Sequence, residues 1–328
     1  MNNNNEGRSP RYRKNQLEEK VLFEINQTLY EKELDLIKNF DKPKLPVIFI
    51  VGAQRSGTTL LMQLITQLYR INYPTNFVAR FWQAPYIGNI LYQSLLWHTT
   101  TEEKPKLESD LGYTSGIDGP HEFGYFWRRW FPWEIPTQKK YDEIDYSILL
   151  KELDAWQSIN NLPIIFKNLI QVDYNIEFLY KIIPKAFFIF VKRDLAHNAY
   201  STYNSRIKLF NDSTKWFGVK PPNYNTLIKL DVFEQIVTQI ITINNDIEKQ
   251  LRNIPAKNSI TIHYEDLIDN FEKEILKIVN KFEIKHYQKE KIMSFTLQSR
   301  NNNSVESTEA FKKIREIIKK IENENENK

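Results

Sequence analysis

The sequence predicts an α/β protein in which a parallel sheet is enclosed between two layers of helices. Short runs of β-branched and aromatic residues alternate along the chain with longer stretches of helical periodicity, which is typical of a parallel sheet. The first run, residues 46–51, is continuously apolar, as a strand buried on both faces should be. A glycine-containing turn and a helix follow this run directly. With 328 residues, 41% of them hydrophobic, the chain can bury one large core.

The elements are expected in the following order. Residues 1–14 are polar and are expected to be a disordered tail, and apolar spacing predicts a helix within residues 16–40. The strand 46–51 precedes a helix at 59–69, and further strands are predicted at 162–167, 186–191 and 259–264, with a helix at 176–183. The main domain then covers residues 43–305. A helical extension at 15–42 precedes it, and a charged helix with a polar tail at 306–328 follows it.

Residues 98–160 interrupt this alternation, because they are rich in Trp, Tyr, Phe, Gly and Pro. Parallel sheets bind ligands beyond the carboxyl ends of their strands. We therefore expect this aromatic-rich insertion to lie over that edge and to bind substrate, with Arg128 and Arg129 among its aromatic residues. The same aromatic residues could equally form a small core of the insertion itself.

Composition excludes several classes of function. The 45 Lys+Arg and 41 Asp+Glu residues leave a net charge of only +4, which does not indicate a nucleic-acid partner. The chain has no cysteine, and its histidines lack metal-ligand spacing, so neither disulfides nor a metal site are expected. The longest apolar run, residues 45–51, is far shorter than the roughly 20 residues of a membrane span. With no signal-peptide pattern, these features predict a cytoplasmic protein without a transmembrane segment.

The turn after the first strand has the pattern of a phosphate-binding loop. Its sequence is Gly52-Ala53-Gln54-Arg55-Ser56-Gly57-Thr58-Thr59. Backbone N–H groups of such a turn and of the following helix N-terminus bind an anion, and the three hydroxyls add donors. The glycine spacing matches nucleotide-triphosphatase loops, but Thr58 stands where those loops carry their lysine. Arg55 is then the only cation inside the loop, which indicates a phosphorylated donor other than ATP.

A second segment, residues 187–201, repeats the arrangement of strand, turn and helix. Arg193 stands at the end of the strand and Ser201 follows eight residues later. Together with the loop, this pattern resembles the PAPS-dependent sulfotransferases, and Arg55 followed by Ser-Gly-Thr-Thr-Leu-Leu resembles their bacterial and carbohydrate-type branches. The resemblance implies a P-loop-like fold and the donor 3'-phosphoadenosine 5'-phosphosulfate (PAPS), with 3',5'-ADP as product.

The resemblance also implies roles for individual residues. The donor would be bound by Gln54, Arg55, Ser56, Gly57, Thr58 and Thr59 at its 5' end and by Arg193 and Ser201 at its 3'-phosphate. Arg300 could replace the C-terminal basic motif of cytosolic members. Those members usually carry a tryptophan shortly after the loop, where this chain has Leu60, so the partner of the adenine is not predicted.

For catalysis, Arg55 is expected to neutralise charge on the leaving phosphate, and the resemblance places Lys167 near the transferred sulfuryl group. Leu169 occupies the position of the cytosolic members' catalytic histidine and cannot take a proton. The base must therefore come from elsewhere. Glu122 is our first candidate and His121 the second, since both lie in one aromatic segment and some sulfotransferases use a glutamate.

The predicted function is transfer of a sulfuryl group to an acceptor hydroxyl on a glycan, a lipid-linked molecule such as a glycolipid, or a small metabolite. Two alternatives stay open at this point. A P-loop kinase or nucleotidase would bind Mg·ATP, and a catalytically inactive scaffold of the same fold would bind neither nucleotide. The oligomeric state is not predicted.

Overall fold

The computed structural model describes residues 5, 7–97, 107–132, 137–282, 284, 297, 299, 301 and 303–326. At its centre is a four-stranded parallel sheet with the strand order β4-β1-β5-β6. The strands are β1 (Val47–Val51), β4 (Ile164–Lys167), β5 (Ala186–Lys192) and β6 (Ser259–His263). All four strands lie where the sequence predicts them, and the α/β class with a parallel sheet is confirmed.

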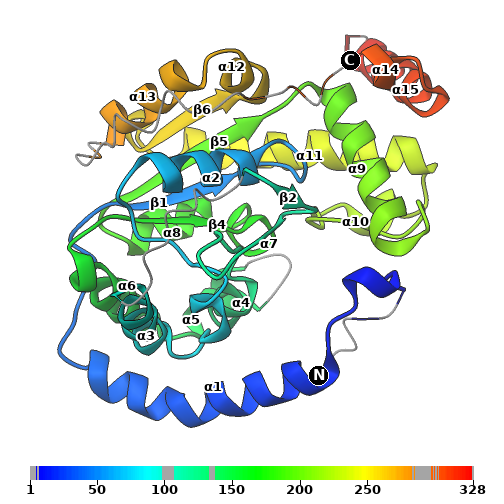
Figure 1. Ribbon diagram of the computed structural model, residues 1–328. Helices are drawn as coiled ribbons and strands as arrows, with labels where there is room; N and C mark the ends of the chain where they lie inside the picture. Colours follow the sequence, from blue (N-terminus) through cyan, green and yellow to red (C-terminus); the bar gives the residue numbers. More distant parts are fainter. Residues whose placement is uncertain are drawn as a thin grey trace.

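Helices cover both faces of the sheet (Figure 1). Side chains alternate along β1, so that Ile48 and Ile50 face one layer and Phe49 faces the other. The first layer contains α2 (Thr58–Leu68), α12 (Tyr264–Asp269) and α13 (Phe271–Phe282). The second contains α6 (Ser147–Asn160), α8 (Ile176–Ile182), α9 (Leu195–Phe210), α11 (Val232–Arg252) and α15 (Glu309–Glu326). The predicted three-layer arrangement is therefore present.

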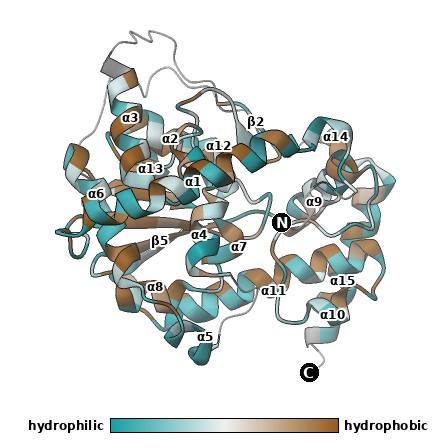
Figure 2. Ribbon diagram, turned by 90° about the horizontal axis from the view of Figure 1, so that it is seen from below, coloured by the Kyte–Doolittle hydropathy of each residue, from teal (hydrophilic) through white to brown (hydrophobic). Residues whose placement is uncertain are grey.

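Short elements connect these layers. They are η2 (Val78–Arg80), α5 (Gln138–Asp142), α7 (Leu169–Val172), α10 (Tyr224–Leu227), η3 (Ala256–Asn258) and α14 (Asn303–Glu306). In Figure 2, β5 is hydrophobic and the helices around it carry hydrophilic residues on other faces, as amphipathic helices on a core do. No helix in the described ranges is long and apolar enough to cross a membrane.

The described part of the insertion divides into a core portion and a portion at the ligand edge. Aromatic residues of α4 (Gly124–Trp130) are buried, and Trp127 packs on Phe49 of β1 and Phe166 of β4. Arg129 donates to the Trp82 carbonyl at 2.7 Å and pairs with buried Glu152 at 3.0 Å. These residues therefore form core, whereas Leu107, the hairpin of β2 (Ser109–Asp110) and β3 (Tyr113–Thr114), and the segment around Glu122 reach the ligand edge.

The N-terminal helix α1 (Gln16–Ile37) lies across the outside of α3 (Pro85–Trp97) and α6 (Figure 1). Its buried Glu33 accepts the backbone N–H groups of Tyr86 and Ile87 in the first turn of α3, at 2.7 and 3.0 Å. Burial raises the pKa of Glu33 to about 7. The extension is thus attached to the domain through a capping carboxyl group as well as through apolar contacts.

Residues 7–14 depart from the expectation of a disordered tail. They include the short helix η1 (Pro10–Tyr12) and lie against the domain. The Ser9 N–H donates to the carbonyl of Leu209 at the end of α9, at 2.8 Å. The Tyr12 hydroxyl donates to Asp110 of the hairpin at 2.8 Å, and Lys14 lies 2.5 Å from the Tyr125 hydroxyl on α4. Polarity alone predicted disorder here, whereas these polar side chains find partners on three separate elements.

Candidate active site

The loop between β1 and α2 depends on two glycines. Gly52 and Gly57 have φ angles of 148° and 102°, in the region that favours glycine. A Cβ on Gly57 would lie 2.6 Å from Cδ2 of Tyr264, and one on Gly52 would lie 2.5 Å from the carbonyl oxygen of Val191. The chain can make this turn only because neither residue has a side chain. The turn brings the N-terminus of α2 to the carboxyl edge of the sheet.

This helix N-terminus presents backbone donors to a ligand. Gly57 is the N-cap residue of α2, and no side chain caps the helix there. The first N–H groups of a helix lack partners within it and attract an anion. Behind the loop, the Gly52 N–H donates to Oδ1 of Asp173 at 3.3 Å, and burial raises the pKa of this carboxyl well above its usual value. The loop is therefore fastened at its back and presents donors at its front.

Two adjoining cavities open beside the loop. The larger has a volume of about 400 Å³, and its lining includes Gln54, Gly57, Thr58, Thr59, Glu122 and Lys167. The smaller, of about 250 Å³, is lined in part by Tyr200, Ser201, Asn204 and Lys208. Arg55 and Arg193 line both cavities, as do Ser109 and Leu111 of the hairpin. The cavities therefore adjoin at two arginines, which suits an elongated ligand with an anionic group in each cavity.

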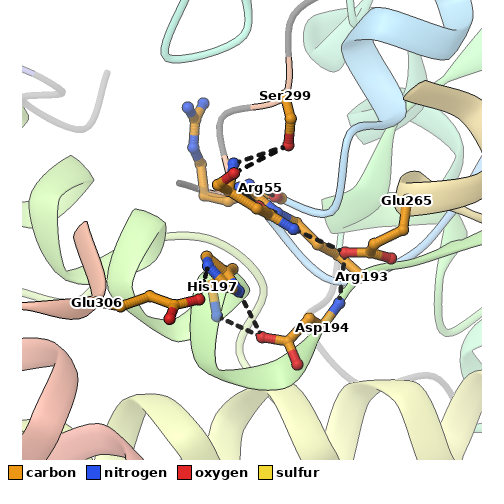
Figure 3. A network of polar contacts seen from close by, with 8 residues as sticks. Arg55, Arg193, Asp194, His197, Glu265, Ser299 and Glu306 are labelled. Carbon is orange, nitrogen blue, oxygen red and sulfur yellow. Dashed lines mark hydrogen bonds and ion pairs between the residues drawn. The ribbon is translucent and has the colours of Figure 1, made fainter. Parts of the chain in front are cut away.

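Arg193 is oriented by contacts on several sides. Its NH1 donates to the Arg55 carbonyl at 3.1 Å, its Nε donates to Oδ1 of Asn301 at 3.0 Å, and its guanidinium lies 4.5 Å from the centre of the Tyr264 ring. Glu265 accepts from the Asp194 N–H at 3.0 Å, next to this arginine (Figure 3). The guanidinium is thereby held at the boundary of the two cavities.

His197 follows in the first turn of α9. Its Nδ1 lies 2.7 Å from the Asp194 carboxylate (Figure 3). Its ring packs on Phe311 of α15. The Asp194 side chain also caps α9 by accepting the His197 N–H at 2.9 Å. These contacts give His197 a packing and capping role.

Arg55 and Ser201 meet at the smaller cavity. Arg55 has a φ of 66°, unusual for a residue with a side chain, and its Nε donates to the Ser201 hydroxyl at 3.2 Å. Ser201 lies on α9, whereas Arg193 lies in the turn between β5 and the N-cap residue Asp194, and both residues line the smaller cavity. Arg55, Arg193 and Ser201, chosen from two separate motifs, therefore converge on one cavity.

Glu122 and Lys167 form the charged pair of the larger cavity. Lys167 is the last residue of β4 and its side chain is only 6% exposed, whereas that of Glu122 is 41% exposed. The Lys167 ammonium contacts Oε1 of Glu122. Gly112, at the tip of the hairpin, lies over this pair: a Cβ there would be 3.1 Å from Oε1 of Glu122 and 3.8 Å from the Thr59 hydroxyl. A carboxylate, a cation and a loop hydroxyl thus gather at one point of the cavity wall.

His121 is arranged differently from its neighbour. Its Nδ1 accepts the N–H of Phe123 at 2.9 Å, so the ring proton of the neutral imidazole is on Nε2. Burial lowers the pKa of His121 to about 4, which keeps the ring neutral. His121 also lies outside the described lining of both cavities. With one nitrogen occupied as acceptor and the other carrying the proton, this histidine has no lone pair left to serve as base.

The remaining predicted residues lie in or behind the loop. Gln54 is buried against Gly218 and reaches the larger cavity, and Ser56 is buried beneath the loop. Ser299 lines the same cavity and Asn301 contacts Arg193, so these two residues near the C-terminus approach the cavities. Arg300 itself lies outside the described residues. Two aromatic side chains, Phe217 and Tyr264, also line the larger cavity.

Sequence reasoning missed several residues of the site. Leu111 and Gly112 form the two-residue turn of the hairpin, a pattern that could have been found from Asp-Leu-Gly-Tyr between polar residues. Asn168 donates to the Glu122 carbonyl at 3.1 Å and caps α7 through its other amide atom, which accepts the Gln171 N–H at 2.9 Å. No sequence signal links Asn168 to Glu122, because 46 residues separate them and only the fold brings them together.

Comparison with known proteins gives consistent results. The profile of the sulfotransferase family matches residues 46–288. The omega-hydroxy-beta-dihydromenaquinone-9 sulfotransferases Stf3 of Mycobacterium bovis and Mycobacterium tuberculosis are 22% identical over 254 residues, 71% of this chain. The chain spans only 61% of the length of these curated relatives. The crystal structure of sulfotransferase STF9 from Mycobacterium avium superposes with a TM-score of 0.51 at 16% identity, over 86% of this chain and 75% of that one, and shows the shared fold.

Proposed function

This chain belongs to the sulfotransferase family, and we propose that it transfers a sulfuryl group from PAPS to a hydroxyl of a lipid-type acceptor. The observation that carries the proposal is the junction of two cavities at Arg55 and Arg193. PAPS carries anionic groups at both ends of its ribose, and this site offers cations and backbone donors at matching places. A nucleotide without a 3'-phosphate would leave the smaller cavity without an anion.

The donor would bind with its 5'-phosphosulfate at the loop and its 3'-phosphate at Arg193 and Ser201. The loop N–H groups and the guanidinium of Arg55 suit a leaving phosphate, because they can make charge-assisted hydrogen bonds to its oxygens. Gln54, Thr58 and Thr59 complete the lining on this side. The structure contains no lysine inside the loop to bind a γ-phosphate, which is why we prefer PAPS to ATP.

Transfer would proceed as an in-line displacement at sulfur. The acceptor oxygen forms a bond to sulfur, the bond from sulfur to the bridging phosphate oxygen breaks, and 3',5'-ADP leaves with that electron pair. Glu122 is the base in this proposal and takes the hydroxyl proton. Lys167, next to Glu122 at the cavity wall, would neutralise charge on the oxygens of the transferred group. His121 is not needed as a base.

The acceptor side of the larger cavity favours an apolar alcohol. Its described lining includes the aliphatic side chains of Leu60, Leu107, Leu111 and Leu169 beside the charged pair. The aromatic residues of α4 that could have stacked on a sugar ring are buried in the core instead. The relatives named above act, by their names, on an omega-hydroxy menaquinone, a lipid with a terminal hydroxyl. We therefore rank a lipid-type alcohol above a glycan.

Calorimetric titration with 3',5'-ADP in EDTA tests the donor site. We expect binding by the wild type and a loss of about 2 kcal/mol in Arg193→Ala, since a charged hydrogen bond disappears. Lys192→Ala is the matched control: it removes a cation from the neighbouring position, but Lys192 pairs with Glu248 at 2.7 Å and lies outside the described lining. Binding of Mg·ATP in place of 3',5'-ADP would support a kinase, and binding of neither would support a scaffold.

A further inference from the structure

The segment that carries Glu122 has an unusual backbone. Phe123, the next residue, has a φ of 54°, in the left-handed region where a bulky residue is rarely found. Such a conformation costs on the order of 1–3 kcal/mol and persists only where its surroundings enforce it. Phe123 is also the N-cap residue of α4, with a buried ring that stacks on Phe126 at 4.7 Å between ring centres. The direction of the Glu122 side chain is therefore set by a strained turn.

Hydrogen bonds hold this turn on both sides of Glu122. Before it, the His121 N–H donates to the carbonyl of Pro74 at 2.7 Å. After it, the Phe123 N–H donates to Nδ1 of His121 at 2.9 Å. The Glu122 carbonyl accepts from Asn168, the residue that follows Lys167. The imidazole of His121 thus supplies the acceptor for the Phe123 amide of the strained turn.

We propose that His121 is a positioning residue, which aims the Glu122 carboxylate at the acceptor hydroxyl by accepting the Phe123 N–H through Nδ1. This inference rests on the proposed function, because aiming Glu122 affects transfer only if Glu122 takes the hydroxyl proton. The hydrogen bond from the Phe123 N–H to His121 does not depend on that assumption. The imidazole acts through a nitrogen that neither gains nor loses a proton during transfer. This positioning role requires a neutral His121 ring that accepts a hydrogen bond at Nδ1 and carries its proton on Nε2.

Three substitutions separate positioning from proton transfer. In His121→Asn, the side-chain oxygen can occupy the place of Nδ1 and accept the same N–H. In His121→Gln, the amide reaches the place of Nε2 instead, and His121→Leu keeps bulk without any acceptor. We expect the asparagine variant to retain kcat within about threefold, and the other two to lose roughly tenfold to hundredfold, because a misplaced catalytic group costs about this much. KM for PAPS should change little in all three.

The assay would use ³⁵S-labelled PAPS with 1-octanol as the probe alcohol, with thermal melting to check folding. Equal loss of kcat in the asparagine and leucine variants, both folded, would show that the histidine acts through its own proton and would overturn the proposal. The kcat–pH profile of the asparagine variant should keep the shape of the wild type, since the titrating base is unchanged. Loss of a limb of that profile would equally overturn it.

A measurement without substrate tests the positioning role of His121 separately from the proposed sulfuryl transfer. Nitrogen-15 NMR of histidine-labelled wild type, assigned by comparison with His121→Asn, should show His121 as the neutral tautomer with its proton on Nε2 at pH 6. Four charged groups influence this ring: Glu122 raises its pKa, and Arg80, Lys14 and Lys167 lower it. A protonated ring, or a proton on Nδ1, would refute the positioning role even in an active enzyme. No transfer to any alcohol, with the expected tautomer, would count against the proposed function alone.

Discussion

The donor half and the acceptor half that we propose for this site are built in different ways. The proposed donor half consists of two short motifs, each a strand end, a turn and the start of a helix. Most of its candidate ligand groups are backbone N–H groups or residues within eight positions of one another. The acceptor half brings together Glu122, Lys167 and the tip of a hairpin, which are distant in sequence. The difference teaches that local backbone geometry can be recognised from sequence, whereas the contacts between side chains on separate elements cannot.

The strongest test of the acceptor half is Glu122→Gln. We expect kcat to fall roughly 10²–10⁴-fold, because general-base catalysis contributes about that much. Affinity for 3',5'-ADP should stay unchanged if the two halves are independent. Glu143→Gln, an exposed glutamate of the same insertion, serves as control. Near-normal transfer by the Glu122 variant would remove this residue from the mechanism and reopen the search for the base.

The corresponding test of the donor half is Gly57→Ala. The added methyl group meets the Tyr264 ring at 2.6 Å in a left-handed conformation, so the loop must shift. We expect affinity for 3',5'-ADP to fall roughly tenfold to hundredfold by titration. Gly124→Ala provides the control, because its Cβ would find only Asn168 at 3.8 Å. Equal affinities in both variants would show that the loop does not bind the donor.

A smaller effect is expected from pH on the free energy of unfolding, through Glu33, the carboxyl group that attaches α1 to α3. The folded-state pKa of Glu33, about 7, lies above its usual value of 4.5, so folding favours the protonated form. The resulting stabilisation is fully present below about pH 4.5 and is lost as the pH rises through about 7. Urea unfolding should therefore show a loss on the order of 2 kcal/mol between pH 5 and pH 8.

In Glu33→Gln, the neutral amide should flatten this pH dependence. Its oxygen can still accept a hydrogen bond from the backbone N–H groups at the start of α3. Glu24→Gln, on the exposed face of the same helix, should leave it unchanged. Parallel pH curves for the wild type and the Glu33 variant would assign the dependence to other groups.

The smallest effect concerns residues 7–14, which contact α9, the hairpin and α4. Asp110 accepts from Tyr12 and pairs with Arg11 at 3.0 Å and Lys208 at 2.5 Å. Asp110→Asn should speed tryptic cleavage within residues 7–14 by about two- to fivefold, since partly exposed ion pairs contribute little. Asp35→Asn, on α1 with the lysine partners Lys32 and Lys38, is the matched control. Cleavage at the wild-type rate would mean that Ser9 and Lys14 hold the segment without Asp110.

Burial and hydrogen bonding distinguish the candidate side chains from one another. The sequence presented His121 and Glu122 as adjacent candidates, and nothing in their order distinguishes them. The structure gives Nδ1 of His121 a backbone partner and leaves the Glu122 carboxylate partly exposed at the cavity. Likewise, Arg129 could have bound an anionic acceptor, but it is paired with Glu152 inside the core. Hydrogen-bond partners and solvent access are properties of the fold, and a list of residue types does not contain them.

By itself, the sequence determined the four strands, the loop with Gly52 and Gly57, and the spacing of Arg193 and Ser201. Each follows from residues close in the chain: continuous apolarity of buried strands, backbone freedom at glycine, and a short turn that joins a strand end to a helix start. Only the tertiary structure decided the strand order, the position of Gly112 over Glu122 and Lys167, and the contacts of residues 7–14. These depend on packing between segments that meet after folding, where the burial of whole faces, and not local preference, selects the partners.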